Sequence, residues 1–315
     1  MSPVLKDSLK SLFDKALPRN FVRAAGLFAV FIIIIVYALS TRDSFLSSGR
    51  FPRDRSEFMK PGQLDRRLSA LEERIKANPD DIQAFFEAGL LKFQKGPDSY
   101  LNAISDLETA RSRGLADIRI FYYLGRMYQA AGLYDFALEE YRRFLNNRPE
   151  DLEVRMLTAK LLFSSGKYPQ AVKEYEDLNA KHPENIIVLE NLALSRWKTG
   201  RDPKPVLDIL GGLGAQAAFR AAYVSGRIDY ENKDYAAAAP KLALAAAGLG
   251  KYPEFSDGAG LYQMLSDSYV KLKSDAQAID ALNELLKISP ANDEARSLLA
   301  RLIKARDKAA AKNKK

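Results

Sequence analysis

Residues 118–185 read IRIFYYLGRMYQAAGLYDFALEEYRRFLNNRPED followed by LEVRMLTAKLLFSSGKYPQAVKEYEDLNAKHPEN. The two lines have the same length of 34 residues, and the same residue types recur at matching positions in both. The matching pairs are Gly132 and Gly166, Tyr134 and Tyr168, Ala137 and Ala171, Tyr141 and Tyr175, and Pro149 and Pro183. Self-similarity at a fixed period of this length indicates a repeat architecture, in which each unit is stable only when it is stacked on its neighbours.

The first line also contains a motif with a defined spacing, W-x2-L-G-x2-Y followed by A, Y, F and P. Its residues here are Phe121, Leu124, Gly125, Tyr128, Ala137, Tyr141, Phe144 and Pro149. In this motif the chain resembles the tetratricopeptide repeat (TPR) family. The resemblance implies an all-α fold, a TPR-like solenoid of helix-turn-helix units. Small residues such as Gly125 would let two helices approach closely, and large residues such as Tyr141 would fill the space between neighbours.

The resemblance covers residues 82–292, which we divide into about six repeats. The fourth departs from the pattern, because Pro203, Pro205 and the glycines of 211–214 shorten its second helix. We expect a capping helix at 63–81 before the repeats and a second at 293–304 after them. Residues 305–315 are then a basic tail.

The N-terminal part has a different composition. Residues 1–23 form a basic segment, and residues 24–40, AAGLFAVFIIIIVYALS, contain no charge. With Phe21, Val22 and Arg23 the apolar stretch reaches 20 residues, which cover about 30 Å as a helix, the thickness of a bilayer core. We therefore predict a single transmembrane helix that contacts the lipid bilayer through residues 21–40. Residues 41–62 would link it to the repeats.

Two questions about this segment stay open. Ala38 and Ser40 are small residues two apart, as at a signal-peptide cleavage site, although the apolar stretch is longer than the usual signal core and favours an uncleaved signal-anchor. Lys15, Arg19 and Arg23 precede the apolar run, which favours a cytoplasmic N-terminus. The repeats would then lie in the periplasm of a bacterium, with the cytosolic face as the alternative.

Composition excludes several kinds of site. The chain has no cysteine, and its single histidine, His182, precedes a proline in a turn between repeats. These residues provide no Ser-His-Asp or Cys-His arrangement and no zinc site, so we predict no enzyme, no metal and no cofactor. The net charge of +8 belongs to the chain ends, because residues 61–303 carry −2. We therefore expect no nucleic acid as a partner.

Binding of other proteins is the function that this leaves. In TPR arrays the usual partner surface is the groove lined by the first helix of each repeat. The first-helix residues that we predict to face this groove are Phe86, Phe93, Tyr122, Arg126, Met156, Lys160, Phe163, Trp197, Tyr223, Arg227 and Tyr230. Such a groove suits peptide segments or helices with apolar and acidic side chains.

We accordingly predict a membrane-anchored TPR scaffold in a bacterial cell-envelope assembly for secretion, motility or envelope biogenesis. The alternative is a cytosol-facing co-receptor for chaperones or imported proteins. TPR receptors for chaperone tails carry a set of Lys, Asn and Arg along successive first helices. The matching positions here hold mainly Tyr122, Met156, Glu190 and Tyr223, which disfavours the alternative.

Overall fold

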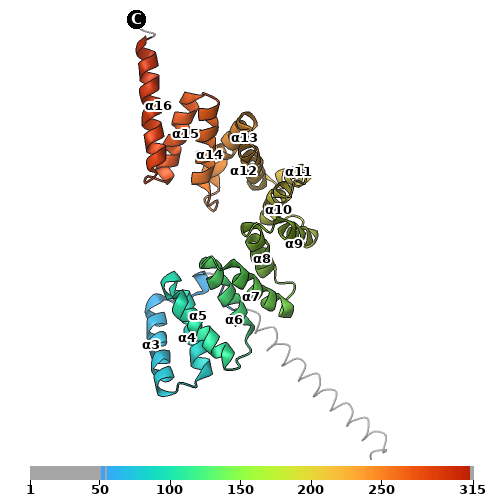
Figure 1. The fold of residues 1–315 in the computed structure, drawn as a ribbon, viewed down its shortest axis with the longest axis vertical. Helices are drawn as coiled ribbons and strands as arrows, with labels where there is room; N and C mark the ends of the chain where they lie inside the picture. Colours follow the sequence, from blue (N-terminus) through green and yellow to red (C-terminus); the bar gives the residue numbers. More distant parts are fainter. Residues whose placement is uncertain (1–50, 54, 313–315) are drawn as a thin grey trace, which may run out of the picture. The chain divides into compact units, whose positions relative to one another are not determined.

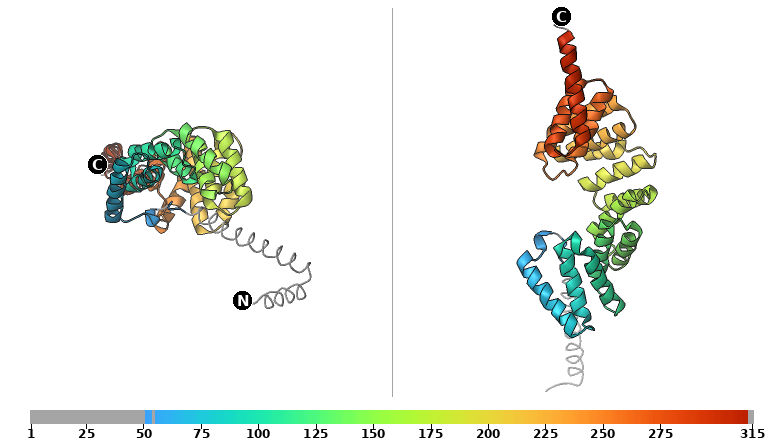
Figure 2. Two further views of the ribbon diagram at one scale, coloured as in Figure 1. Left: turned by 90° about the horizontal axis from the view of Figure 1, so that it is seen from below. Right: turned by 60° about the vertical axis from the view of Figure 1, so that its left-hand side comes forward.

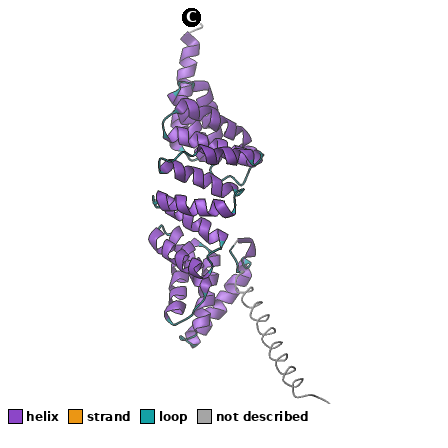
Figure 3. Ribbon diagram, turned by 90° about the vertical axis from the view of Figure 1, so that its right-hand side faces the viewer, coloured by secondary structure: helices purple, strands orange, loops and turns teal. Residues whose placement is uncertain are grey.

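The computed structural model describes residues 51–53 and 55–312. All secondary-structure elements in this part of the chain are helices, joined by loops and turns (Figures 1 and 3). The predicted basic segment at 1–23, the transmembrane helix at 24–40 and the first part of the linker lie outside the described residues. Among the helices of the described residues, none has the length and apolarity needed to cross a bilayer. The chain divides into two compact units, residues 1–79 and 80–315.

The described residues of the first unit contain one long helix. A 3-10 turn, η1 (Arg55–Glu57), precedes α3 (Pro61–Ala77), which begins at a proline. Proline suits this position because the first helical residue has no hydrogen-bonding partner for its N–H. Leu64, Leu68 and Leu71 are the buried residues of α3 and recur at helical spacing. The predicted role of this segment as a cap stays a prediction.

The second unit consists of six consecutive helical pairs and a final helix, as Figure 2 shows from two directions. The pairs are α4 (Ile82–Lys95) with α5 (Tyr100–Ser112), α6 (Ile118–Ala130) with α7 (Tyr134–Asn147), α8 (Leu152–Ser164) with α9 (Tyr168–Lys181), α10 (Ile186–Lys198) with α11 (Lys204–Gly212), α12 (Ala215–Glu231) with α13 (Tyr235–Gly248), and α14 (Gly258–Lys271) with α15 (Asp275–Ile288). Two short 3-10 turns, η2 (Pro97–Ser99) and η3 (Leu249–Lys251), interrupt the connections, and α16 (Asp293–Lys312) ends the unit.

The starts of three first helices, α6, α8 and α10, follow the period of the sequence. Asp117, Asp151 and Asn185 lie 34 residues apart, and each accepts a hydrogen bond from a backbone N–H in the first turn of α6, α8 and α10. Such side chains satisfy N–H groups that have no partner inside the helix. The end of these helices is equally regular, because Gly132 and Gly166 adopt left-handed backbone angles with φ of 74° and 73°. Glycine adopts this conformation without steric cost.

The closest helix approach within a pair occurs at a glycine. A Cβ atom added to Gly125 on α6 would lie 2.4 Å from Cε1 of Tyr141 on α7. Gly226 on α12 has the same relation to Leu242 on α13, at 2.8 Å from Cγ. Tyr141 is fully buried, and its hydroxyl donates to Oε1 of Gln129 at 2.8 Å. Glycine is therefore required at these two positions because the partner helix packs a large side chain directly against the backbone.

The regular pattern changes in the fourth pair and at the C-terminus. Helix α11 is the shortest α-helix of the unit, with nine residues between Lys204 and Gly212, where prolines and glycines bound the segment. Helix α16 packs against α15 through Ala295, Leu298 and Leu299. It continues to Lys312, beyond the residue at which we expected the tail to begin. A single apolar cluster extends from Ala159 on α8 to Ala281 on α15.

The Gly125 contact yields a test of this packing. We expect Gly125→Ala to lower the free energy of unfolding by about 1–3 kcal/mol, because the buried ring of Tyr141 has no space to move away. Gly212→Ala is the matched control, since nothing lies within 4 Å of a Cβ atom at that helical position. There alanine should be neutral or stabilise by about 0.5–1 kcal/mol. Urea denaturation followed by circular dichroism measures both, and similar losses in the two variants would contradict the packing argument.

Candidate functional site

A hollow of about 330 Å³ opens on the first helices of three consecutive pairs. We call it the first-helix hollow. Its lining residues come from α8, α10, α12 and the loop before α14: Lys160, Phe163, Ser164, Glu190, Asn191, Leu194, Arg220, Tyr223, Arg227, Glu254, Phe255, Ser256 and Asp257. On each helix the lining positions are one, three, four or seven residues apart, so they fall on one side of the helix. The repeat pattern thus aligns equivalent faces of neighbouring first helices.

A buried ion pair ties α10 to α12 at the base of this hollow. Nη1 of Arg220 lies 2.6 Å from Oε2 of Glu190, and the two side chains are 12% and 13% exposed. Burial raises the pKa of Glu190, although the hydrogen bond from Arg220 and the charge of Arg227 oppose this shift. Arg220 also lies over the ring of Phe255, 5.5 Å from its centroid. Arg220 is therefore committed to contacts within the protein.

The loop at residues 254–257 closes one side of the hollow, and three contacts hold it. The Tyr223 hydroxyl donates a short hydrogen bond to the Asp257 carboxylate, and Nε2 of Gln216 donates to Oε1 of Glu254 at 2.5 Å. The Phe255 ring packs edge-on against Phe219 and Tyr223, with centroids 5.0 and 4.8 Å apart. The sequence showed a long loop here but gave no sign that it lines the groove.

Charges in the hollow are balanced except at its outer edge. Three cations and three carboxylates line it, and most of them are paired; Arg227, for example, lies 2.9 Å from Glu231 just outside the hollow. Lys160 is exposed, and no other residue of the described chain forms an ion pair or hydrogen bond with it. Phe163 beside it is half-buried and contacts Tyr168 edge-on at 5.2 Å. Lys160 and Phe163 therefore offer an available cation beside an apolar surface.

The structure brings together four of the residues predicted to face the groove. Lys160, Phe163, Tyr223 and Arg227 all line the first-helix hollow. Sequence reasoning did not select Ser164, Arg220 or the loop at 254–257. A helical-face pattern extended to every first-helix position would have found Ser164 and Arg220, but the loop carries no periodic signal.

Other predicted groove residues lie within the packing. Phe86, Phe93 and Tyr122 are buried, as is Tyr223 of the hollow, and Tyr122 has no exposed surface. The Tyr122 hydroxyl donates to Oε1 of Glu153 at 2.6 Å and accepts from Nη1 of Arg126 at 2.9 Å. Burial, more than any other factor, raises the pKa of Tyr122. These contacts join α6 to the start of α8, so Tyr122 acts in packing and we leave its ring out of the proposed surface.

The remaining predicted residues are half-buried and lie outside the first-helix hollow. Nε1 of Trp197 donates to Oδ1 of Asn232 at 3.2 Å, which joins α10 to the end of α12. The Tyr230 hydroxyl donates to Oδ2 of Asp267 on α14 at 3.0 Å, and burial raises its pKa to about 12. Met156 packs against the apolar cluster. Partner contact by these residues stays a prediction.

The two candidates for metal binding, His182 and the acidic side chains, form no metal site in the described residues. His182 follows α9, and its backbone N–H donates to the carbonyl of Leu178. No group of three or more His, Cys, Asp or Glu side chains in the described residues could hold a metal ion. Charged groups and apolar surface adjoin one another in the first-helix hollow.

Comparison with solved structures identifies proteins of similar fold. No protein-family model and no curated protein sequence matches the chain. Among solved structures, it is similar to a tetratricopeptide repeat protein from Parabacteroides merdae, with 15% sequence identity and a TM-score of 0.56 over 77% of this chain and 93% of the other. The C-terminal part of a TPR repeat-containing protein from Cytophaga hutchinsonii gives 15% identity and 0.51 over 75% and 95%.

A third similar structure is PilW, described as a widely conserved type IV pilus biogenesis factor. It shares 15% identity with this chain and has a TM-score of 0.51, covering 69% of this chain and 98% of its own. At such identities the likeness shows the fold. The described part of the chain is an all-α TPR-like solenoid, which confirms the helical repeat architecture predicted from residues 118–185.

The Tyr223 contact yields a test of how the loop is held. We expect Tyr223→Phe to lower the free energy of unfolding by about 0.5–1.5 kcal/mol, because Asp257 loses a hydrogen-bond donor. Tyr269→Phe is the matched control, since no described residue forms a hydrogen bond with that hydroxyl, and we expect a change within about 0.5 kcal/mol. Urea denaturation measures both, and hydrogen exchange should accelerate at 254–257 in the first variant only. Equal effects would show that the loop is held by other contacts.

Proposed function

We propose that this protein is a scaffold that binds a segment of a partner protein in the first-helix hollow. The carrying observation is the exposed and unpaired Lys160 beside half-buried Phe163, at a hollow whose other charges are satisfied within the described chain. A groove that combines apolar surface with one available charge can select a segment by both shape and sign.

The chemistry of the hollow defines the partner segment. Phe163 offers apolar surface, and Lys160 can form an ion pair with a carboxylate of the partner. The carboxylates of the 254–257 loop disfavour a densely acidic segment, because Glu254 and Asp257 lie on the same rim. We therefore propose an extended or helical segment with one apolar anchor and one acidic side chain.

The similar structures support a scaffold role. They are TPR proteins, and one of them, PilW, is a type IV pilus biogenesis factor. Another similar structure, the Cut9–Hcn1 hetero-tetramer, shows a fold of this kind within a protein assembly, at 14% identity and a TM-score of 0.51. These neighbours support the docking of other proteins as the proposed role.

The proposed cellular setting comes from the sequence. The uncharged run at 24–40 would anchor the chain in a bacterial inner membrane, and the basic residues before it favour a periplasmic solenoid. Anchoring would raise the effective concentration of the solenoid near membrane-bound partners. We propose a role in an envelope assembly for secretion, motility or envelope biogenesis, with a cytosol-facing co-receptor as the alternative.

Photocrosslinking in native membranes tests the binding site. A benzophenone amino acid at Ser164, which lines the hollow and is exposed, should give a discrete crosslinked product. The double variant Lys160→Glu and Phe163→Ala should reduce its yield at least about tenfold, because both the ion pair and the apolar anchor are lost. Benzophenone at Lys173, exposed on the second helix α9, is the control and should not give this product. An unchanged yield of the crosslinked product in the double variant would show that the partner does not bind in the first-helix hollow.

Protease protection tests the membrane arrangement. We expect protease added to intact spheroplasts to digest the solenoid, because the proposed orientation exposes it outside the inner membrane. A cytosolic protein detected in the same sample provides the control for spheroplast integrity. Protection of the solenoid until detergent is added would favour the cytosol-facing alternative. Recovery of the solenoid in the fraction without membranes would contradict the anchor.

A further inference from the structure

A second hollow, of about 520 Å³, lies at the junction of the fifth and sixth helical pairs. Its lining residues come from the second helices α13 and α15 and from α14, which lies between them in the chain and in Figure 1. Three alanines line it, Ala243 and Ala246 on α13 and Ala281 on α15. We call it the alanine hollow. It shares no residue with the first-helix hollow.

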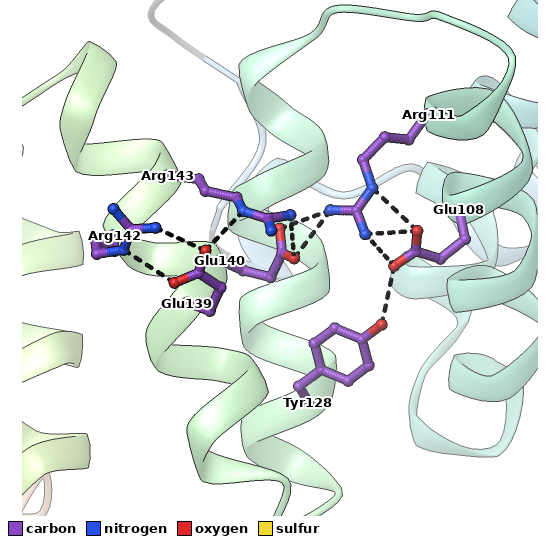
Figure 4. A network of polar contacts seen from close by, with 7 residues as sticks. All are labelled: Glu108, Arg111, Tyr128, Glu139, Glu140, Arg142 and Arg143. Carbon is purple, nitrogen blue, oxygen red and sulfur yellow. Dashed lines mark hydrogen bonds and ion pairs between the residues drawn. The ribbon is translucent and has the colours of Figure 1, made fainter.

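The corresponding place between the first and second pairs is filled by a polar network (Figure 4). Arg111 on α5 binds both oxygens of Glu140 on α7, at 2.9 and 3.0 Å. The same guanidinium binds Glu108, and the Tyr128 hydroxyl on α6 donates to Oε1 of Glu108 at 3.0 Å. Glu140 is nearly fully buried. These four side chains join three helices across the junction.

The repeat register shows that the alanine hollow replaces this network. Glu108 and Arg111 follow Ala103 by five and eight residues, as Ala243 and Ala246 follow Ala238. On the next second helix, Glu140 follows Ala137 by three residues, as Ala281 follows Ala278. On the first helix between them, Tyr128 follows Leu124 by four residues, as Tyr269 follows Leu265. Three charged side chains of one junction are therefore alanines in the other, while the tyrosine is retained.

The retained tyrosine has lost its acceptor. No described residue forms a hydrogen bond with the hydroxyl of Tyr269, or with that of Tyr262, which also lines the hollow. Burial raises the pKa of Tyr262. The junction between the third and fourth pairs follows the other pattern, because Arg196, at the Tyr128 position, lies 2.9 Å from Glu176, at the Glu108 position. The junction of α13 and α15 thus differs from the junction of the first and second pairs and from that of the third and fourth pairs, because alanines replace the charged residues.

The rim of the alanine hollow is acidic. Glu284 is paired with Lys287 at 2.5 Å, whereas no described residue pairs with Asp280. The rim therefore carries one uncompensated negative charge, and the amides of Gln277 and Asn283 lie beside it. Apolar walls, two aromatic rings and one free carboxylate match a side chain that combines an aliphatic stem with a delocalised cation.

We propose that the alanine hollow binds an arginine side chain presented by an apolar segment of a partner protein. The aliphatic stem packs on Ala243, Ala246 and Ala281, where Arg111 and its partners pack at the first junction. The guanidinium donates to the carboxylate of Asp280 and to the Tyr269 hydroxyl. This surface belongs to the second helices, so it would allow a scaffold to hold a second partner without using the first-helix hollow.

A pair of short capped helical peptides tests this proposal with the full chain. One carries a central arginine flanked by leucine and alanine, and the other carries citrulline, the neutral isostere of arginine, at the same position. Fluorescence anisotropy should show that the arginine peptide binds at least about tenfold more tightly, because citrulline forms neither the ion pair nor the cation–π contact. Asp280→Asn should reduce the difference between the peptides, because it removes the ion pair and leaves the cation–π contact.

Two further variants separate this hollow from the proposed function. Ala243→Glu with Ala246→Arg restores the charged pair of the first junction, fills the hollow and should abolish binding of both peptides, with circular dichroism confirming an unchanged helix content. Lys160→Glu, in the other hollow, should leave peptide binding unchanged. Equal binding of the two peptides, no binding at about 1 mM, or binding that survives the filled hollow would each overturn the proposal.

Discussion

The solenoid depends on the close approach of the two helices within each pair. At Gly125 the backbone of α6 meets the ring of Tyr141 at a distance that leaves no space for a Cβ atom, and Gly226 meets Leu242 in the same way. In these pairs a large side chain fills the space between the helices because the opposite helix presents a glycine at the point of contact. This constraint fixes the relative rotation of the two helices, and it therefore fixes which of their faces remain for neighbours and partners.

Polar contacts between pairs depend on that geometry and vary along the unit. The junction of the first two pairs is held by Arg111 and Glu140, and the inner side of the next by Tyr122 and Glu153. Near the C-terminal end the same positions hold alanines, and an open hollow results. Packing within a pair tolerates this variation because it uses other residues. The junctions are consequently the places where a repeat array of this kind can acquire binding surfaces.

The sequence predicted the helical pairs well because their signals are local and periodic. Asp117, Asp151 and Asn185 lie one period apart and each begins a helix, and prolines and glycines bound the short helix α11. The candidate surface was predicted only in part. Lys160, Phe163 and Arg227 line the hollow, whereas Tyr122 turns inward because its hydroxyl reaches Glu153 on the next first helix. A helical-face pattern shows the side of the helix on which a residue lies but not the contact that covers it.

By itself the sequence determined the all-α repeat architecture, the spacing of the turns and the positions of the close helix contacts, because each depends on residues a fixed distance apart in the chain. Only the tertiary structure decided which groove residues stay accessible, since accessibility depends on partners about one repeat away, such as Asp257 for Tyr223. It also decided that the 254–257 loop lines the first-helix hollow and that the three alanines form a second hollow. Hollows arise where side chains from several helices fail to fill a shared volume, and no single segment of the sequence specifies that volume.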